Sequence, residues 1–161
     1  MVIISRASPF QGIIDLGIRD LKGGEEMALE KGLIGEVEHG VTPETTATNY
    51  ANPGVEVLAT PVVVAWIEEA AMQATQGHLE KGQTTVGTVV NIKHMAATPL
   101  GMKVKARAHI KEVDGRRLLF SVEAFDEVEK IAEGEHERFI ISLERFMGRV
   151  QEKEKKHKGA S

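Results

Sequence analysis

Alternating apolar and polar residues dominate the second half of the chain and predict antiparallel β-strands. The segment 102–113, for example, places apolar side chains at alternate positions, as a strand with one buried face does. The Asp114-Gly115 pair that follows it is a strong hairpin signal. The predicted strands are residues 33–42, 86–95, 102–113, 117–126 and 130–146. In 130–146, Gly134 indicates a bulge or a close backbone approach.

One helix is predicted between the first strand and the others. Thr60 is a good N-cap, and Pro61 suits the first helical position because no amide hydrogen is needed there. Residues 62–79 then have a helical period, a wide alanine-rich apolar face and an end near Gly82. Residues 43–59 predict a long loop, of a length typical of functional lids. The fold class is therefore α+β, with a curved antiparallel sheet around one long central helix.

The two ends of the 161-residue chain differ from this core. In residues 1–30, glycines interrupt the apolar residues, and this pattern predicts an N-terminal extension. Met27, within this segment, is a candidate natural start of the protein. Residues 31–150 form the predicted domain. Residues 151–161 are charged, have no apolar face and predict a solvated tail.

Composition narrows the function classes. Lysine and arginine total 20 against 24 acidic residues, a net charge of −4 that gives no support for a nucleic-acid partner. The chain has no cysteine, which excludes disulfides and thiolate chemistry and fits a cytoplasmic location. No window approaches the roughly 18 consecutive apolar residues that cross a bilayer, so no membrane partner is expected. Unpaired edge strands favour a homodimer, which could stack into a tetramer.

Three residues are candidates for chemistry, each with a plainer alternative. Thr60 lies at a helix N-terminus, where an oxyanion is favoured, but it could be only an N-cap. Glu68 lies toward the apolar side of the helix, where desolvation would raise its pKa, or it could reach water at the flank. His94 ends a strand and could be a surface residue, with His136 beside the Gly134 irregularity as its main rival.

No metal or cofactor is expected from the sequence. The His136-Glu137 pair lacks the second histidine of a zinc-binding helix, and no acidic cluster has the spacing of a calcium loop. Glycine-rich phosphate loops are also absent from the sequence.

Several separated motifs resemble the hotdog-fold acyl-CoA thioesterases, and in particular the fluoroacetyl-CoA thioesterase family. The likeness runs from about Leu33 to Val150. Its motifs are Leu58-Ala-Thr60 followed by an apolar helix with Glu68, Val86-Gly-Thr88, His94-Met-Ala-Ala-Thr-Pro-Leu-Gly101, Val113-Asp-Gly-Arg-Arg-Leu118 and Gly134-Glu-His-Glu-Arg138. The resemblance implies a hotdog fold and hydrolysis of an acyl-CoA thioester.

The resemblance also implies roles for five residues. Thr60, Glu68 and His94 occupy the family's catalytic threonine, glutamate and histidine positions. Gly87 matches a backbone position close to the thioester, and Arg138 matches an arginine beside the pocket. The expected reaction is hydrolysis of a short or medium acyl-CoA thioester to the free acid and CoA. The alternatives are a non-catalytic acyl-CoA-binding module and an enoyl-CoA hydratase.

Two observations qualify this expectation. The family's fluoroacetyl enzymes have phenylalanines in the lid, but here the corresponding residues are Ala51 and Gly54, so fluoroacetyl selectivity is not expected. Eight helical residues separate Thr60 and Glu68 by about 12 Å. The two side chains must therefore converge or come from different subunits, which predicts a pocket at or near a dimer interface.

Overall fold

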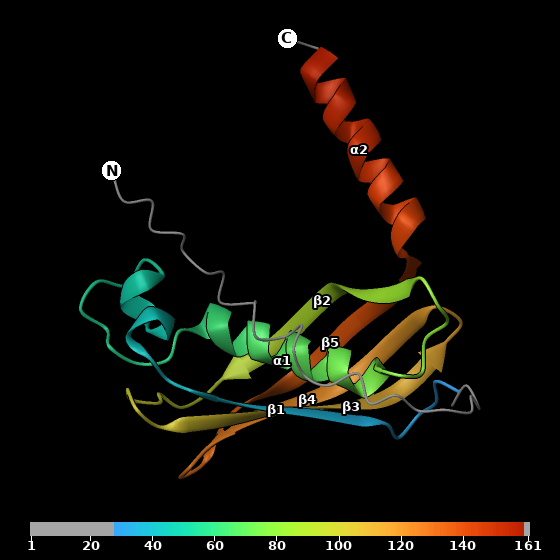
Figure 1. Cartoon of the computed structure of the whole chain (residues 1–161). Coiled ribbons are helices and arrows are strands. Elements are labelled where there is room, and N and C mark those ends of the chain that lie inside the picture. The colour runs from blue at the N-terminus through green and yellow to red at the C-terminus, as the bar shows by residue number, and fades with distance from the viewer. Residues whose placement is uncertain (1–27, 160–161) are drawn as a thin grey trace, which may run out of the picture.

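A computed structural model describes residues 28–159 of the chain. The candidate start at Met27 and most of the expected N-terminal extension lie outside the described residues. Five strands form one antiparallel sheet in the order β1-β3-β4-β5-β2, with one helix against the sheet and a second at the C-terminal end (Figure 1). The strands and α-helices are β1 (Ile34–Gly40), α1 (Thr60–Thr75), β2 (Gln83–His94), β3 (Lys103–Asp114), β4 (Arg117–Asp126), β5 (Lys130–Ser142) and α2 (Leu143–Gly159). Two short 3-10 helices, η2 (Pro43–Thr45) and η3 (Ala47–Asn49), lie in the segment predicted to be a long loop.

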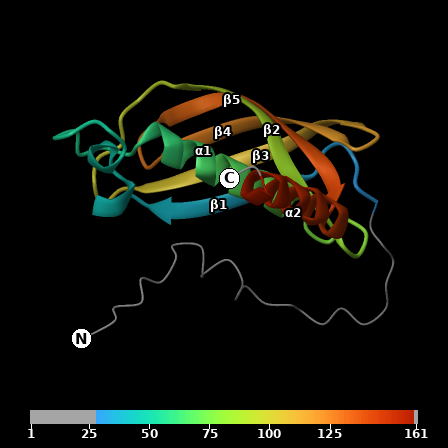
Figure 2. The same cartoon turned by 90° about the horizontal axis from the view of Figure 1, so that it is seen from above.

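The sheet curves around α1, which crosses its concave face (Figures 1 and 2). Ile67, Ala70 and Ala71 on this face of α1 are fully buried. Gly35 of β1 passes so close to the helix that a Cβ there would overlap the carbonyl oxygen of Ala70. The small side chains of α1 thus allow the sheet to pack closely, as the alanine-rich face predicts.

The predicted hairpin between β3 and β4 is confirmed. Asp114 ends β3, Arg117 begins β4, and Gly115 takes a φ of 55°, a left-handed conformation that glycine adopts at no steric cost. The close approach expected at Gly134 is also confirmed, because a Cβ there would overlap the carbonyl oxygen of Asn91 on β2.

Helix α1 ends earlier than predicted. It stops at Thr75, where Gln76 becomes extended and Gly77 takes a φ of 81°. A left-handed glycine just beyond the last turn is a usual helix terminator, and residues 76–82 then connect α1 to β2. At the other end, Ala59 is the N-cap of α1, and Thr60 is the first helical residue.

The C-terminal part of the chain differs most from expectation. Residues 143–146 were expected to continue the last strand, but β5 ends at Ser142, whose partner Gln83 begins β2. Residues 143–159 form α2 instead, which extends away from the sheet beyond the β2 edge (Figure 1). Because no strand partner remains beyond Gln83, helix formation satisfies the backbone hydrogen bonds.

Strand β2 forms one edge of the sheet and pairs only with β5. Its register shifts between Gly87 and Val89, which marks a β-bulge. Val89 and Val90 on this strand are 50% and 37% exposed. Within residues 28–159, no helix is long and apolar enough to cross a membrane.

Candidate active site

The first residue of α1 and the last residue of β2 meet at one end of the molecule. The Thr60 hydroxyl and Nδ1 of His94 are 2.8 Å apart, a hydrogen-bond distance. The backbone around the pair is fixed, because the Leu58 amide donates to the Thr98 carbonyl at 2.9 Å. The hydroxyl of Thr60 thus binds His94, and no side chain caps the helix. The N-cap alternative for Thr60 is therefore wrong.

The imidazole of His94 is in an unusual state. Its Nε2 atom is buried and has no hydrogen-bond partner among the described residues. Desolvation lowers the pKa of His94 below its ordinary value, although an interaction with the Ala96 backbone opposes the shift, and the lowered pKa favours the neutral ring. In the tautomer with the proton on Nε2, Nδ1 accepts the hydrogen bond from Thr60. A neutral imidazole bound to a hydroxyl is the arrangement that general-base catalysis requires.

A cavity of about 350 Å³ lies beside this pair. Its walls come from the loop before α1, from the start of α1 and from residues 94–97. Tyr50 and Val55 of the loop line the cavity, and they flank the two lid positions singled out in the sequence. Ala51 and Gly54 themselves have φ angles of 70° and 84°, so the loop turns sharply at both positions. Sequence reasoning missed Tyr50, although it is the only tyrosine in the chain.

Glu68 belongs to a different cluster. Its Oε1 atom lies 4.0 Å from Nε2 of His136, and its side chain is 41% exposed. A Cβ at position 87 would overlap Oε1 of Glu68, so the missing side chain of Gly87 makes room for the carboxylate. Glu68 therefore reaches water, as the second of its two alternatives expected.

His136 and Arg138 form the buried part of this cluster. Nδ1 of His136 donates to the Val89 carbonyl at 2.8 Å, and Arg138 contacts Nε2 of the same ring at 3.1 Å. A guanidinium only donates, so Nε2 must be the acceptor and His136 must be neutral. Arg138 also donates to the hydroxyl and the carbonyl of Thr85, at 2.8 and 2.9 Å. Burial lowers the pKa of His136, as does the neighbouring positive charge of Arg138, while Glu68 opposes the shift.

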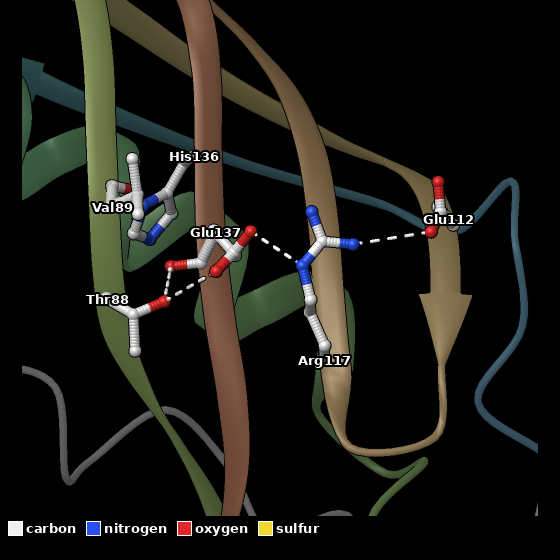
Figure 3. A network of polar contacts seen from close by, with 6 residues as sticks. All are labelled: Thr88, Val89, Glu112, Arg117, His136 and Glu137. Atoms are coloured by element: carbon white, nitrogen blue, oxygen red, sulfur yellow. Dashed lines mark hydrogen bonds and ion pairs between the residues drawn. The ribbon is translucent and has the colours of Figure 1, made fainter.

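Strand β5, which contains His136 and Arg138, carries a separate polar network on its outer face (Figure 3). Thr88 donates to the carbonyl and the carboxylate of Glu137, at 3.1 and 3.3 Å. Arg117 binds Glu137 at 2.7 Å and Glu112 at 3.3 Å, and the bond to Glu137 raises the pKa of the arginine. Glu137 is thus paired, and it lies on the opposite side of the sheet from its neighbour His136.

The structure brings the five candidate residues together in two groups. Thr60 meets His94, while Glu68 lies with Gly87 and Arg138. The length of α1 between Thr60 and Glu68 keeps the groups apart within one chain, as the helical spacing predicts. Sequence reasoning treated His136 only as a rival of His94. The sequence did contain a signal for its role. His136 lies two residues before Arg138 on a predicted strand, so both side chains are on one face of that strand.

No group of three or more His, Asp or Glu side chains within residues 28–159 is arranged to hold a metal ion. The hydroxyl of Thr60 and the imidazole of His94 meet at the wall of the cavity, and Tyr50 and Asn52 of the loop also line it with polar side chains.

A curved antiparallel sheet around one central helix defines the hotdog fold. A hot-dog-like protein from Thermanaerovibrio acidaminovorans superimposes with a TM-score of 0.71, covering 78% of this chain and 93% of that chain at 24% identity. The predicted α+β hotdog architecture is confirmed by this likeness and by the sheet order.

The chain belongs to the fluoroacetyl-CoA-specific thioesterase (FlK) family, whose sequence model matches residues 41–144. The fluoroacetyl-CoA thioesterase of Streptantibioticus cattleyicolor is 42% identical over 98 residues, which cover 61% of this chain and 70% of that protein. A variant of FlK solved with fluoroacetate and CoA is 36% identical, with a TM-score of 0.68 over 73% of this chain and 98% of that chain. These findings confirm the resemblance found in the sequence.

Proposed function

We propose that this protein hydrolyses acyl-CoA thioesters with a short or medium acyl group, releasing the free acid and CoA. Membership of a thioesterase family makes acyl-CoA thioester hydrolysis its general activity. The observation that carries the proposal for this site is the 2.8 Å contact between Thr60 and His94 at the wall of a 350 Å³ cavity. A cavity of this volume fits a small acyl chain.

The proposed chemistry begins at Thr60. His94 takes the hydroxyl proton as the Thr60 oxygen attacks the thioester carbonyl carbon, and the C–S bond then breaks to release the CoA thiolate, which takes up a proton. Water attacks the resulting ester with His94 again as the base, which frees the acid and restores Thr60. Direct attack by water that His94 activates is the alternative route. The amide of Thr60 and the amide of Gly87 are the candidate oxyanion donors, because Pro61 has no amide hydrogen and the amides of Val62 and Val63 donate to the Ala59 carbonyl.

In this proposal, Glu68 reaches the thioester site from a second subunit. Strand β2 is an edge with exposed valines, and antiparallel pairing of two such edges would make a homodimer. That pairing lays the start of one β2 strand beside the end of the other. The partner's Glu68 and the partner's Gly87 would then approach His94 and the carbonyl. The acyl-CoA site would lie at the dimer interface, and stacking of dimers into a tetramer stays a prediction.

The lid supports an acyl group other than fluoroacetyl. Ala51 and Gly54 occupy the places of the family's lid phenylalanines, so no aromatic ring closes over the acyl group from those positions. Tyr50 and Val55 line the cavity instead. A less closed lid accepts a longer chain than fluoroacetate.

Mass spectrometry of products from a panel of acyl-CoA thioesters tests the proposal. We expect free acid and CoA from short and medium chains, with no preference for fluoroacetyl-CoA over acetyl-CoA. A non-catalytic binding module would instead be stabilised by acyl-CoA against heat without releasing CoA. A hydratase would add water to an enoyl-CoA and leave the thioester intact. Either of these results would contradict the proposal.

A further inference from the structure

A second cavity, of about 510 Å³, lies between α2 and the outer face of the sheet, and we name it the α2 groove. Its floor is formed by Val86 of β2 and by Phe139 and Ile141 of β5. The first turns of α2 form its wall, with Phe146 and Val150 facing the cavity. The groove lies on the opposite side of the sheet from α1, because Phe139 follows the inward-facing Arg138.

The groove concentrates positive charge. Arg145, Arg149 and Lys153 of α2 line it at intervals of four residues, which places them on one face of the helix. Arg116, from the turn between β3 and β4, lines the groove as well. No carboxylate lines it, and none of the three α2 cations has an ion pair within residues 28–159. This local charge contrasts with the net charge of −4 for the whole chain.

The groove also offers a flat surface. The guanidinium of Arg116 lies over the ring of Phe139, 5.0 Å from its centroid. A carboxylate close to the floor is that of Glu137, which binds Thr88 and is held by Arg117 at 2.7 Å (Figure 3). Arg117, which also binds Glu112, offsets part of the charge of Glu137, and Glu137 itself does not line the groove. A stacked guanidinium and aromatic ring beside free cations suit a planar base that carries phosphates.

We infer that the α2 groove binds the phosphorylated adenosine end of the CoA thioester. The pyrophosphate and the 3′-phosphate of CoA would contact Arg145, Arg149 and Lys153, and the adenine would lie against Phe139 and Arg116. The identity of the ligand in this inference rests on the proposed function. The charge and shape of the groove do not depend on it. Antiparallel pairing of β2 edges in the proposed homodimer would lay Val86, in the floor of the groove, alongside the end of the partner's β2 strand, with the groove on the outer face of the joined sheet.

Kinetics with two matched substrates test the inference. The acyl-CoA contains the nucleotide, whereas the N-acetylcysteamine thioester of the same acid lacks it. For R149E we expect the KM for acyl-CoA to rise about tenfold or more, since a charge-assisted contact is replaced by repulsion. The kcat for acyl-CoA and all constants for the N-acetylcysteamine thioester should stay unchanged.

The control is K155E, which makes the same charge change in α2 but on a side of the helix away from the groove. It should leave the KM for both substrates unchanged. Equal effects of R149E and K155E, or an equal effect of R149E on both substrates, would overturn the inference. A change of subunit assembly in R149E without a change of KM would show that the groove serves a second copy of the chain, and would overturn it too.

Calorimetric titration separates the inference from the proposed function. Adenosine 3′,5′-bisphosphate should bind the wild-type protein and K155E, and bind R149E at least about tenfold more weakly. That result would support the groove even if no thioester were hydrolysed. Absence of binding, or equal binding of inorganic phosphate and the nucleotide, would overturn the groove even if hydrolysis were fast.

Discussion

Two histidines of this protein lie in contrasting surroundings. His94 binds one hydroxyl and leaves its second ring nitrogen buried without a partner among the described residues. His136 uses both ring nitrogens, one on the Val89 carbonyl and the other on Arg138. Burial lowers the pKa of both rings. The free hydrogen-bonding capacity, and not the direction of the pKa shift, distinguishes a candidate base from a structural residue.

The two sites also differ in how the backbone holds them. Thr60 and His94 come from the ends of elements, beside a cavity and a long loop. Arg138 lies inside β5 and is bound to Thr85 on the neighbouring strand. We therefore expect changes at Thr60 and His94 to affect turnover, and changes at Arg138 to affect stability.

The largest expected effect is on turnover in H94N. Loss of the general base should lower kcat about 10²–10⁴-fold, with little change in the free energy of unfolding. Steady-state hydrolysis of the best acyl-CoA from the panel measures it. H157N, on the exposed end of α2, is the control and should keep full activity. Retention of wild-type kcat in H94N would remove His94 from the mechanism.

The next effect is on stability in R138L. This change leaves the Thr85 carbonyl and Nε2 of His136 buried without donors, which should cost about 2–4 kcal/mol of unfolding free energy. T60V, which keeps the side-chain shape, should cost less than about 1 kcal/mol and still lose turnover. Urea unfolding of both variants is the measurement. Equal destabilisation would erase the contrast between the two sites.

G87A tests the link between Gly87 and Glu68. The added Cβ overlaps the Glu68 carboxylate, so the side chain must move, at a cost of about 1–3 kcal/mol and with reduced turnover. G40A, on another strand where a Cβ meets nothing within 4 Å, is the matched control. Full activity in G87A would show that the position of Glu68 is unimportant for the reaction.

A smaller effect is expected on the pH dependence of stability. The folded protein holds His136 neutral with a lowered pKa, so the unfolded chain binds more protons at mildly acidic pH. The free energy of unfolding should therefore be highest above the ordinary histidine pKa and fall by about 1 kcal/mol for each pH unit below it. Urea unfolding from pH 7 to pH 5 measures this fall, and H136Q should show a shallower one. An equal slope in H136Q would assign the effect to another group.

The smallest effect is expected for Y50A. Removing the ring from the cavity wall should change the preference among acyl chains by a few fold, in favour of longer ones, with unfolding free energy nearly unchanged. The ratio of kcat/KM for medium and short chains measures this. An unchanged ratio would exclude Tyr50 from acyl selection.

Much of this architecture could be predicted because it follows from local patterns. The alternation of apolar and polar residues predicted the strands, and the Asp114-Gly115 pair predicted the hairpin between β3 and β4. The identity of α2 could not be read in this way, because whether residue 143 continues a strand depends on where β2 begins. The contact between His136 and Glu68 likewise depends on sheet register and on the missing side chain at Gly87. Thr60 and His94 were candidates by their positions in the sequence, the resemblance implied their catalytic roles, and the structure adds their hydrogen bond.

The most direct test of the account is subunit complementation. H94N and E68Q are each expected to be inactive and folded. After joint refolding, a mixed dimer would contain one intact site, made of His94 from one subunit and Glu68 from the other, and roughly a quarter of wild-type activity should return. Mixed dimers without any recovered hydrolysis would contradict a site shared between subunits.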